Sequence, residues 1–194
     1  MEFKVEVSAR HIHLTQEHVE ALFGAGHQLT FIRELSQPGQ YLCEEKVTLV
    51  KGDRKLERVS VLGPVRKSSQ VELSRTDCIS LRANAIVRES GDTAGTEAVT
   101  LVGPAGTVEL EEGLIVAKAH IHATPEDAEK LGVKDKDIVN VAVEGEGRKL
   151  VFGNIVVRVN PTYALAMHID TDEGNAAYLP RSGGTGRIVT VENF

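Results

Sequence analysis

The sequence predicts a mainly β protein made of two related halves, and three observations support this prediction. Short runs rich in β-branched residues recur along the chain between Gly and Pro turns. One thirteen-residue segment occurs twice, each time with the pattern of a strand that leads into a helix. A polar stretch with two glycines separates the two copies. Closely spaced short strands of this kind favour β-barrels or β-sandwiches.

The polar stretch Glu89–Glu97 contains no large apolar residue and is the best candidate for a linker. We therefore expect a first domain over residues 1–92 and a second over residues 93–194, each with one copy of the repeat, with an approximate boundary that strands can cross. In such a duplicated protein, the natural place for a shared site is the seam between the halves. The clearest predicted strands are Lys46–Val50, Arg58–Leu62, Val99–Val102, Leu114–Ala117, Ile138–Val143 and Asn154–Val159.

The repeated segment reads RHIHLTQEHVEAL over Arg10–Leu22 and AHIHATPEDAEKL over Ala119–Leu131, an offset of 109 residues (120 − 11). In both copies a Thr stands where a helix N-cap belongs, acidic residues follow in the first turn, and a Gly ends the helix. The repeat therefore predicts two short helices, bounded by Thr15 and Gly24 and by Thr124 and Gly132.

Each copy contains the tripeptide His-Ile-His, which is a candidate metal-binding pair. Side chains two apart on a strand share one face, so both imidazoles of a pair can converge on one metal ion. A single pair of this kind is more often a chance pair of packed or hydrogen-bonded rings. Two chance pairs would not share the same flanking Thr, acidic turn and Leu. The duplication therefore makes metal binding the better hypothesis for His11 with His13 and for His120 with His122.

His168 lies in the alternating segment Ala166–Asp170 and is a candidate third ligand for one pair. Three protein ligands leave a position open, as in catalytic zinc sites, whereas structural sites have four ligands, usually with Cys. The chain has two cysteines, Cys43 and Cys78, which is too few for a structural zinc site or a disulfide framework. We expect both to be small buried residues rather than acyl carriers. The remaining histidines are expected to be solvated: His18 and His27.

Other families with His-x-His sites fit less well. The first copy matches most of the cupin signature through His11, His13, Glu17 and Gly24. A cupin needs that Glu on a strand, whereas Glu17 follows a Thr cap in a segment that reads as helix. A metallo-β-lactamase-like site would need Asp and His directly after the pair, and an amidohydrolase barrel would need a longer chain.

Composition excludes several classes of function. The formal net charge of −6 argues against general nucleic-acid binding but leaves room for a local basic pocket that binds a small anion. No apolar run approaches the roughly 20 residues of a membrane span, so we expect no membrane association and a cytoplasmic location. Arg66 and Glu72 stand six residues apart around a short polar turn, and composition alone would make both of them solvated surface charges.

Five segments carry a more specific signal. In order they read SARHIHL, ELSQPGQ, LGPVRKSSQVELSRTD, HIHATPEDAEKLGVKDKD and MHIDTDEGNAA. Together they resemble the PduL-type phosphotransacylases, also called phosphate propanoyltransferases, over nearly the whole chain. The resemblance implies two tandem β-barrel domains capped by short helices. It also implies a reaction that exchanges coenzyme A and phosphate on a short acyl group, with propionyl-CoA or acetyl-CoA as the acyl-CoA.

The resemblance also implies the residues of the site. Two open zinc sites are implied, one held by His11, His13 and Glu72, the other by His120, His122 and His168. Arg66 would be the catalytic arginine, because its planar fork suits two phosphate oxygens. Contacts to coenzyme A would come from Ser8, Ala9, Arg10, Arg33, Gln40 and Asn175.

The chain departs from the family pattern near the nucleotide. Ala119 stands where the family often has Arg, Arg33 replaces a usual Lys, and Ser60 stands where some members carry a basic residue. Members that enter bacterial microcompartments carry an N-terminal extension, whereas only ten residues precede His11. We therefore expect a cytosolic member or a chain that lacks this segment. We also expect a homo-oligomer.

These residues permit a mechanism of direct transfer. The first zinc ion would take the sulfur of coenzyme A as its fourth ligand, which ionises the thiol. The second would bind phosphate or polarise the acyl carbonyl, while Arg66 neutralises further negative charge. The competing hypothesis is a non-catalytic β-barrel protein with structural zinc at the domain seam.

Overall fold

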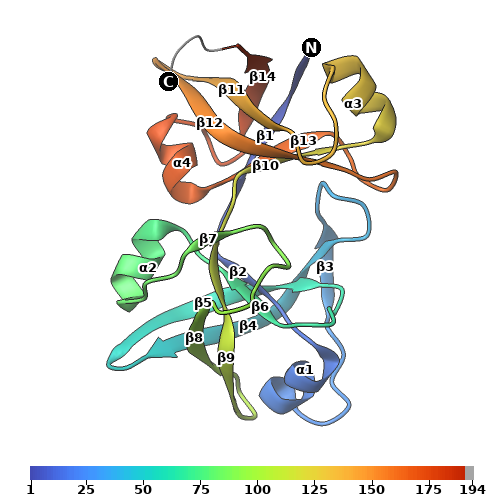
Figure 1. The fold of residues 1–194 in the computed structure, drawn as a ribbon. Coiled ribbons are helices and arrows are strands. Elements are labelled where there is room, and N and C mark those ends of the chain that lie inside the picture. Colours follow the sequence, from blue (N-terminus) through green and yellow to red (C-terminus); the bar gives the residue numbers. More distant parts are fainter. Residues whose placement is uncertain (191–194) are drawn as a thin grey trace. The chain divides into compact units, whose positions relative to one another are not determined.

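The computed structural model describes residues 1–190 and is mainly β, as predicted (Figure 1). The four helices among these residues are short: α1 Gln16–Phe23, α2 Arg75–Leu81, α3 Pro125–Leu131 and α4 Thr171–Ala176. The strands are β1 Glu2–Ser8, β2 His11–His13, β3 Phe31–Glu34, β4 Tyr41–Lys51, β5 Arg54–Gly63, β6 Gln70–Glu72, β7 Val87–Arg88, β8 Glu97–Val102, β9 Thr107–Ala117, β10 His120–Ala123, β11 Ile138–Gly145, β12 Arg148–Val159, β13 Ala166–Asp170 and β14 Gly184–Val189. All six of the predicted strands fall within these elements.

The first of two compact units covers Ala9–Ala117. Its sheet closes on itself, because β4 pairs with β5, β5 with β2, β2 with β6, β6 with β9, β9 with β8, and β8 with β4. We call this six-stranded structure the first barrel. Two short strands extend it, β3 beside β4 and β7 beside β9.

The second unit combines Met1–Ser8 with the chain from Lys118 onward. It is also a closed six-stranded barrel, in the order β1, β13, β10, β12, β11, β14, and we call it the second barrel. The same order occurs in the first barrel as β9, β6, β2, β5, β4, β8. The prediction of two related β-barrels is therefore confirmed.

The two barrels exchange a strand. β1 closes the second barrel by pairing with β13 and β14, yet the chain continues from it directly into β2 of the first barrel. In the same way β9 belongs to the first barrel and leads directly into β10 of the second. Each copy of the repeat is thus preceded by a strand that completes the other barrel.

This exchange explains why the units differ from the domains expected at residues 1–92 and 93–194. The strands β8 and β9 follow the polar stretch that was expected to be the linker, but they pair with β4 and β6 of the first barrel. The polar stretch is a loop between β7 and β8 within one unit. Strand pairing, rather than the composition of a loop, decides which residues belong together.

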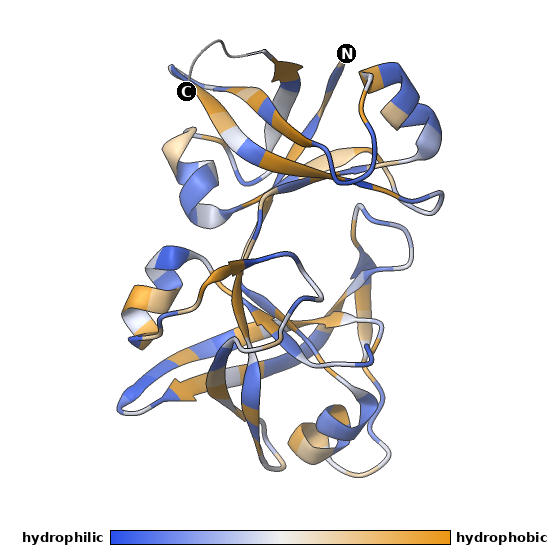
Figure 2. Ribbon diagram, in the orientation of Figure 1, coloured by the Kyte–Doolittle hydropathy of each residue, from blue (hydrophilic) through white to orange (hydrophobic). Residues whose placement is uncertain are grey.

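Each barrel has its own hydrophobic core. Along the strands, apolar and polar residues alternate, as the bands of colour in Figure 2 show. In the repeated strands, Ile12 and Ile121 are fully buried in the two cores. Because neighbouring side chains on a strand point to opposite faces, the histidines on either side of these isoleucines lie on the outer face of each barrel.

The repeated segments end in helices, as predicted. The hydroxyl of Thr15 accepts a hydrogen bond from the backbone N–H of His18, and that of Thr124 accepts one from Asp127, both at 3.1 Å. Gly24 and Gly132 are the C-caps of α1 and α3. Among the described residues, no helix is long and apolar enough to cross a membrane.

Candidate active site

Strand register brings the third residue of each triad beside its His pair. In the first barrel, β2 and β6 are antiparallel and place His11 directly opposite Glu72. In the second barrel, β10 and β13 are antiparallel and place His120 directly opposite His168. Glu72 and His168 therefore occupy equivalent positions in the two barrels. We call His11, His13 and Glu72 the first triad, and His120, His122 and His168 the second triad.

The first triad is compact and almost fully buried. Each of its three residues offers one ligand atom, and these three atoms lie within 4.8 Å of one another. The Nε2 atom of His11 lies 3.3 Å from Oε2 of Glu72, and the His11 and His13 rings meet edge to face with centroids 5.1 Å apart. Glu72 is only 8% exposed, so the solvated surface charge that composition favoured is wrong.

Burial and charge set the protonation of this triad. Burial alone would favour neutral forms, but the neighbouring Glu72 carboxylate outweighs it and raises the pKa of His11. Burial would likewise raise the pKa of Glu72, but the charge and hydrogen bond of His11 hold it well below its usual value. Burial, helped by His11 and Arg66, lowers the pKa of His13 well below its usual value. The carboxylate of Glu72 and the neutral imidazole of His13 are thus favoured, and both are forms that bind a metal ion.

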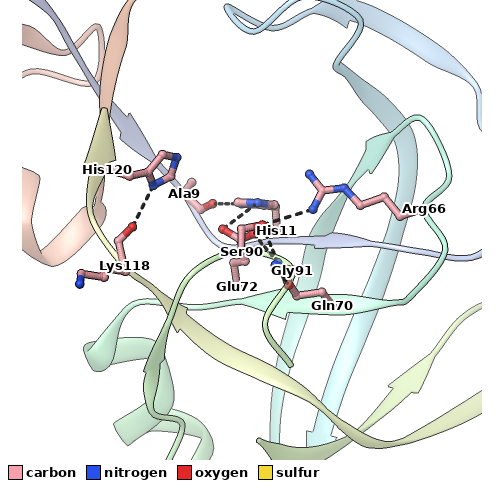
Figure 3. A network of polar contacts seen from close by, with 9 residues as sticks. All are labelled: Ala9, His11, Arg66, Gln70, Glu72, Ser90, Gly91, Lys118 and His120. Carbon is pink, nitrogen blue, oxygen red and sulfur yellow. Dashed lines mark hydrogen bonds and ion pairs between the residues drawn. The ribbon is translucent and has the colours of Figure 1, made fainter. Parts of the chain in front are cut away.

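Hydrogen bonds leave the ring nitrogens of both His pairs suited to metal binding. Nδ1 of His11 bonds to the carbonyl of Ala9 at 2.9 Å (Figure 3), and Nδ1 of His120 bonds to the carbonyl of Lys118 at 2.8 Å. In His11 and His120 the bonded Nδ1 therefore carries a proton, so Nε2 is the ring nitrogen that would bind a metal ion.

The second histidine of each pair has a buried ring nitrogen without a hydrogen-bond partner in the described part of the chain. Nδ1 of His13 and Nδ1 of His122 are buried and have no hydrogen-bond partner among the described residues. A buried polar atom without a partner is costly, and the same atom is orphaned in both barrels. A metal ion would satisfy it in each case, so the residues of both triads fit metal binding.

The second triad is built from three imidazoles. Its ring centroids lie 4.6 Å apart for His120 and His122, 5.3 Å for His120 and His168, and 4.9 Å for His122 and His168. Burial, together with the other two imidazoles and Arg158, lowers the pKa of His122 to about 2. The ring of Tyr163 covers His122 at a centroid distance of 4.2 Å. This triad carries no carboxylate of its own.

Arg66 lies in the loop after β5 and approaches the first triad through Ser90. Its backbone N–H donates to the carbonyl of Leu14 at 2.8 Å, which ties the loop to the end of β2. Its Nη1 donates to the hydroxyl of Ser90 at 3.3 Å, and that hydroxyl donates to Oε1 of Glu72 at 2.9 Å (Figure 3). Gln70 donates to the same carboxylate oxygen at 2.6 Å. The guanidinium is thus held close to the buried carboxylate.

The residues expected to contact coenzyme A are divided between the barrels. In the first barrel, the Arg10 guanidinium is paired with the carboxylate of Asp77 at the start of α2. Arg33 lies exposed on β3, and Gln40 lies across the turn between β3 and β4. Their contacts to coenzyme A stay predictions. The full set is Ser8, Ala9, Arg10, Arg33 and Gln40, with Asn175 exposed in α4.

The remaining candidates have structural roles. Both cysteines are buried, as predicted, and burial raises the pKa of each thiol to about 11. Neither is therefore a ready nucleophile. The expectation of solvated rings is wrong for the other histidines. His18 bonds to the Ser69 hydroxyl and His27 to the Glu45 carboxylate, both at 2.7 Å.

Sequence reasoning missed the groups that surround the triads. Ser90 lies in the polar loop that was expected to be a linker, where a hydroxyl gives no pattern. Glu6, Arg158 and Tyr163 lie near the second triad and reach it through strand pairing or loop folding. Glu6 could have been found only after β1 had been paired in the correct register with the strand that carries His168.

The fold and the two triads define a class of protein: a duplicated double barrel in which each barrel presents a candidate metal site on its outer face. Comparison with known proteins makes the class specific. The family model for phosphate propanoyltransferase matches residues 4–180. A phosphate propanoyltransferase of Thermotoga maritima is 50% identical over 190 residues, which cover 98% of this chain and 89% of the relative.

Two further relatives agree. Phosphate propanoyltransferases of Listeria monocytogenes and Enterococcus faecalis are 50% and 51% identical, each covering 96% of this chain and 86% and 88% of the relative. The chain belongs to the phosphate propanoyltransferase family. It is therefore an acyltransferase, and the prediction of an enzyme is confirmed.

Proposed function

We propose that the protein interconverts a short-chain acyl-CoA plus phosphate with an acyl phosphate plus coenzyme A, using one divalent metal ion at each triad. The observation that carries this proposal is the pair of buried, unpartnered Nδ1 atoms of His13 and His122 at equivalent positions in a member of an acyltransferase family. Zinc is the first candidate for the metal, because open sites of three imidazoles, or of two imidazoles with a carboxylate, suit it.

The first triad is the proposed site for the thiol of coenzyme A. A bound zinc ion lowers the pKa of a thiol and polarises an oxygen that it binds. Glu72 gives this triad one formal negative charge, which reduces its attraction for anionic oxygens. Ser90 and Gln70 hold the carboxylate in place by donating to Oε1, so that Oε2 faces His11. The triad is thereby ordered before any ligand arrives.

The second triad is the proposed site for phosphate or the acyl oxygen. Its three imidazoles carry no formal negative charge when neutral, so a divalent ion there would attract anions more strongly. The nearby Arg158 adds positive charge, which is felt in the lowered pKa of His122. The charges of the two triads thus differ in the direction that an exchange between a thiol and phosphate requires.

Arg66 is the proposed phosphate-binding residue. Ser90 orients its guanidinium through Nη1, and a guanidinium can offer two parallel N–H groups to one phosphate. Lys would offer a point charge in place of this fork.

We propose direct transfer of the acyl group, without an acyl-enzyme. The thiols of Cys43 and Cys78 are buried, and their raised pKa of about 11 keeps them protonated at neutral pH. In the direction of acyl phosphate formation, a phosphate oxygen forms a bond to the carbonyl carbon of the thioester. The carbon–sulfur bond breaks, and the sulfur leaves as the thiolate of coenzyme A. Propionyl is the first candidate acyl group. A cytoplasmic or microcompartment location and a homo-oligomeric state stay predictions.

Metal analysis and a thiol-release assay on one preparation test this proposal. We expect about two zinc ions per chain and release of free thiol when propionyl-CoA or acetyl-CoA meets phosphate. Chelation should abolish release and metal should restore it. If chelated and metal-loaded protein are equally inactive with several acyl chain lengths, the proposed reaction is wrong. If they are equally active, the metal requirement is wrong.

The variant Arg66→Ala tests the role of the guanidinium. We expect kcat/KM for phosphate to fall about a hundredfold, as for loss of one charged donor at a reacting oxygen, with the zinc content unchanged. Lys67→Ala is the matched control, because Lys67 is the next residue in the loop and is exposed. Loss of zinc from Arg66→Ala would mean that the residue is structural.

A further inference from the structure

Glu6 lies beside the second triad on the outer face of the second barrel. The parallel pairing of β1 with β13 places Glu6 directly beside His168, and the antiparallel pairing of β13 with β10 places His168 opposite His120. These three side chains thus form one row across three neighbouring strands. Figure 1 shows β1, in blue, crossing the second barrel next to β13.

The carboxylate of Glu6 approaches the ring of His168. Its Oε2 lies 3.7 Å from Nδ1 of His168, and both side chains are mostly buried, at 17% and 14% exposure. Its other oxygen, Oε1, is paired with Lys4, whose side chain is 57% exposed. One carboxylate oxygen thus faces the imidazole and the other faces a cation at the surface.

The equivalent position in the first barrel has no carboxylate. β6 pairs in parallel with β9, which places Ile115 beside Glu72 as Glu6 is placed beside His168. The offset between Glu6 and Ile115 is 109 residues (115 − 6), the same as between the two His pairs. A carboxylate therefore accompanies the triad whose third member is an imidazole, and an aliphatic side chain accompanies the triad whose third member is itself a carboxylate.

We propose that Glu6 is a positioning residue of the second metal site, whose carboxylate accepts the Nδ1–H of His168 and so presents Nε2 of that ring to the metal ion. A metal-bound imidazole that donates its other N–H to a carboxylate is fixed in tautomer and orientation and is a stronger ligand. His120 obtains this support from the carbonyl of Lys118, whereas for His168 the Glu6 carboxylate, 3.7 Å away, would supply it. This inference rests on the proposed metal site at the second triad.

Metal titration of full-length variants tests the inference. The parent is Glu72→Ala, in which the first triad is disabled and the second triad is the remaining site. In this background Glu6→Gln should weaken Co²⁺ affinity about 10- to 100-fold, as for loss of a carboxylate behind a ligating imidazole. Glu2→Gln is the matched control, because Glu2 lies on the same face of β1, carries the same charge and is exposed. It should leave the affinity unchanged.

The visible absorption of bound Co²⁺ separates positioning from direct ligation. A positioning role predicts that the absorption bands of Glu6→Gln at saturation match those of the parent, because the ligand set is retained. A changed spectrum would overturn it in favour of Glu6 as a fourth ligand. Equal affinities for Glu6→Gln and Glu2→Gln would also overturn it, while leaving the metal site intact. If the parent binds no Co²⁺ although its circular dichroism is native, the second metal site itself is wrong.

Discussion

The two barrels present the same backbone and different chemistry. In each, a His-x-His strand lies between an antiparallel partner that supplies the third side chain and a parallel partner on the other side. The third side chain is Glu72 in the first barrel and His168 in the second. The comparison teaches that register fixes where the three side chains meet, whereas the residue types at those positions decide the charge of each site.

The difference extends to the neighbours of each triad. Gln70 lies opposite His13 and donates to Glu72, while the equivalent Ala166 lies opposite His122 and cannot donate. The residues on the neighbouring strands differ too, because Ser60 and Ile115 border the first triad where Val156 and Glu6 border the second. A carboxylate within the first triad, Glu72, is therefore replaced by a carboxylate beside the second, Glu6.

Removing the third residue of each triad should have the largest effect. We expect Glu72→Ala and His168→Ala each to lose about one metal ion per chain, and thiol release to fall about a thousandfold or more, since Lewis-acid stabilisation contributes several kcal/mol. Metal analysis and the thiol-release assay measure both effects. Glu57→Ala is the control, because Glu57 is an exposed carboxylate paired with Lys55. If either triad variant keeps two metal ions, that residue is not a ligand.

The variant Glu72→His tests whether charge distinguishes the triads, because it makes the first triad chemically like the second. We expect the metal ion to stay and kcat for acyl-CoA formation from acyl phosphate and coenzyme A to fall about tenfold to a hundredfold. A more positive site lowers the pKa of the thiol further, and a less basic thiolate is a poorer nucleophile. Metal content and kcat should be measured together. Activity equal to that of the unchanged protein would show that the charge difference is irrelevant to the reaction.

The helices after the triads differ in a testable way. At the third position of α2, Asp77 is paired with Arg10. At the third position of α4, Glu173 has no equivalent arginine to pair with, because Ala119 is the counterpart of Arg10 in the repeat. Burial, with the neighbouring carboxylates Asp170 and Asp172, raises the pKa of Glu173 to about 7.

The stability of the protein should therefore depend on pH through Glu173. The protonated form is favoured in the folded state, so its contribution is complete below the ordinary pKa of 4.5 and is lost as pH rises through about 7. At pH 8, Glu173→Gln should stabilise the metal-free protein by on the order of 1–2 kcal/mol, and should remove this pH dependence. Asp77→Asn should instead destabilise it slightly. Thermal unfolding between pH 5 and pH 8 measures both, and a Glu173→Gln variant that unfolds like the unchanged protein at every pH contradicts the assignment.

The smallest effect is expected for Ser90→Ala. The hydroxyl links Arg66 to the proposed metal ligand Glu72 but is not itself a proposed ligand, so its loss should cost about 1 kcal/mol of unfolding free energy and a few-fold in kcat/KM for phosphate. Denaturant unfolding and the thiol-release assay test this. Ser80→Ala serves as the control, because Ser80 is exposed and bonds within α2. A loss of both metal ions would show that the network does more than orient one carboxylate.

Local patterns predicted the parts of this fold that depend on neighbouring residues. The Thr caps, the Gly ends of the helices and the alternation of His with Ile in both repeats depend on the conformation of a few consecutive residues. Glu72 was different, because its burial follows from pairing with a strand 61 residues earlier (72 − 11), which no local pattern records. The family resemblance found it where periodicity favoured a solvated charge.

Which strand is exchanged could not be predicted for the same reason. A strand of alternating residues such as β1 closes either barrel equally well by pattern alone. The polar loop between β7 and β8 has the composition of a linker, but composition does not record that β8 and β9 pair with strands on its other side. Boundaries drawn from loops are therefore least reliable where a chain alternates between two sheets.

The exchanged strand has a consequence for synthesis of the chain. The first barrel is made from one continuous stretch, Ala9–Ala117, and has all its strands as soon as β9 leaves the ribosome. The second barrel cannot close until β14 is made, because β1 must wait for its partners β13 and β14. β1 is thus translated before the first barrel but finds its place after it, and the nascent chain carries an unpaired strand until β14 is made.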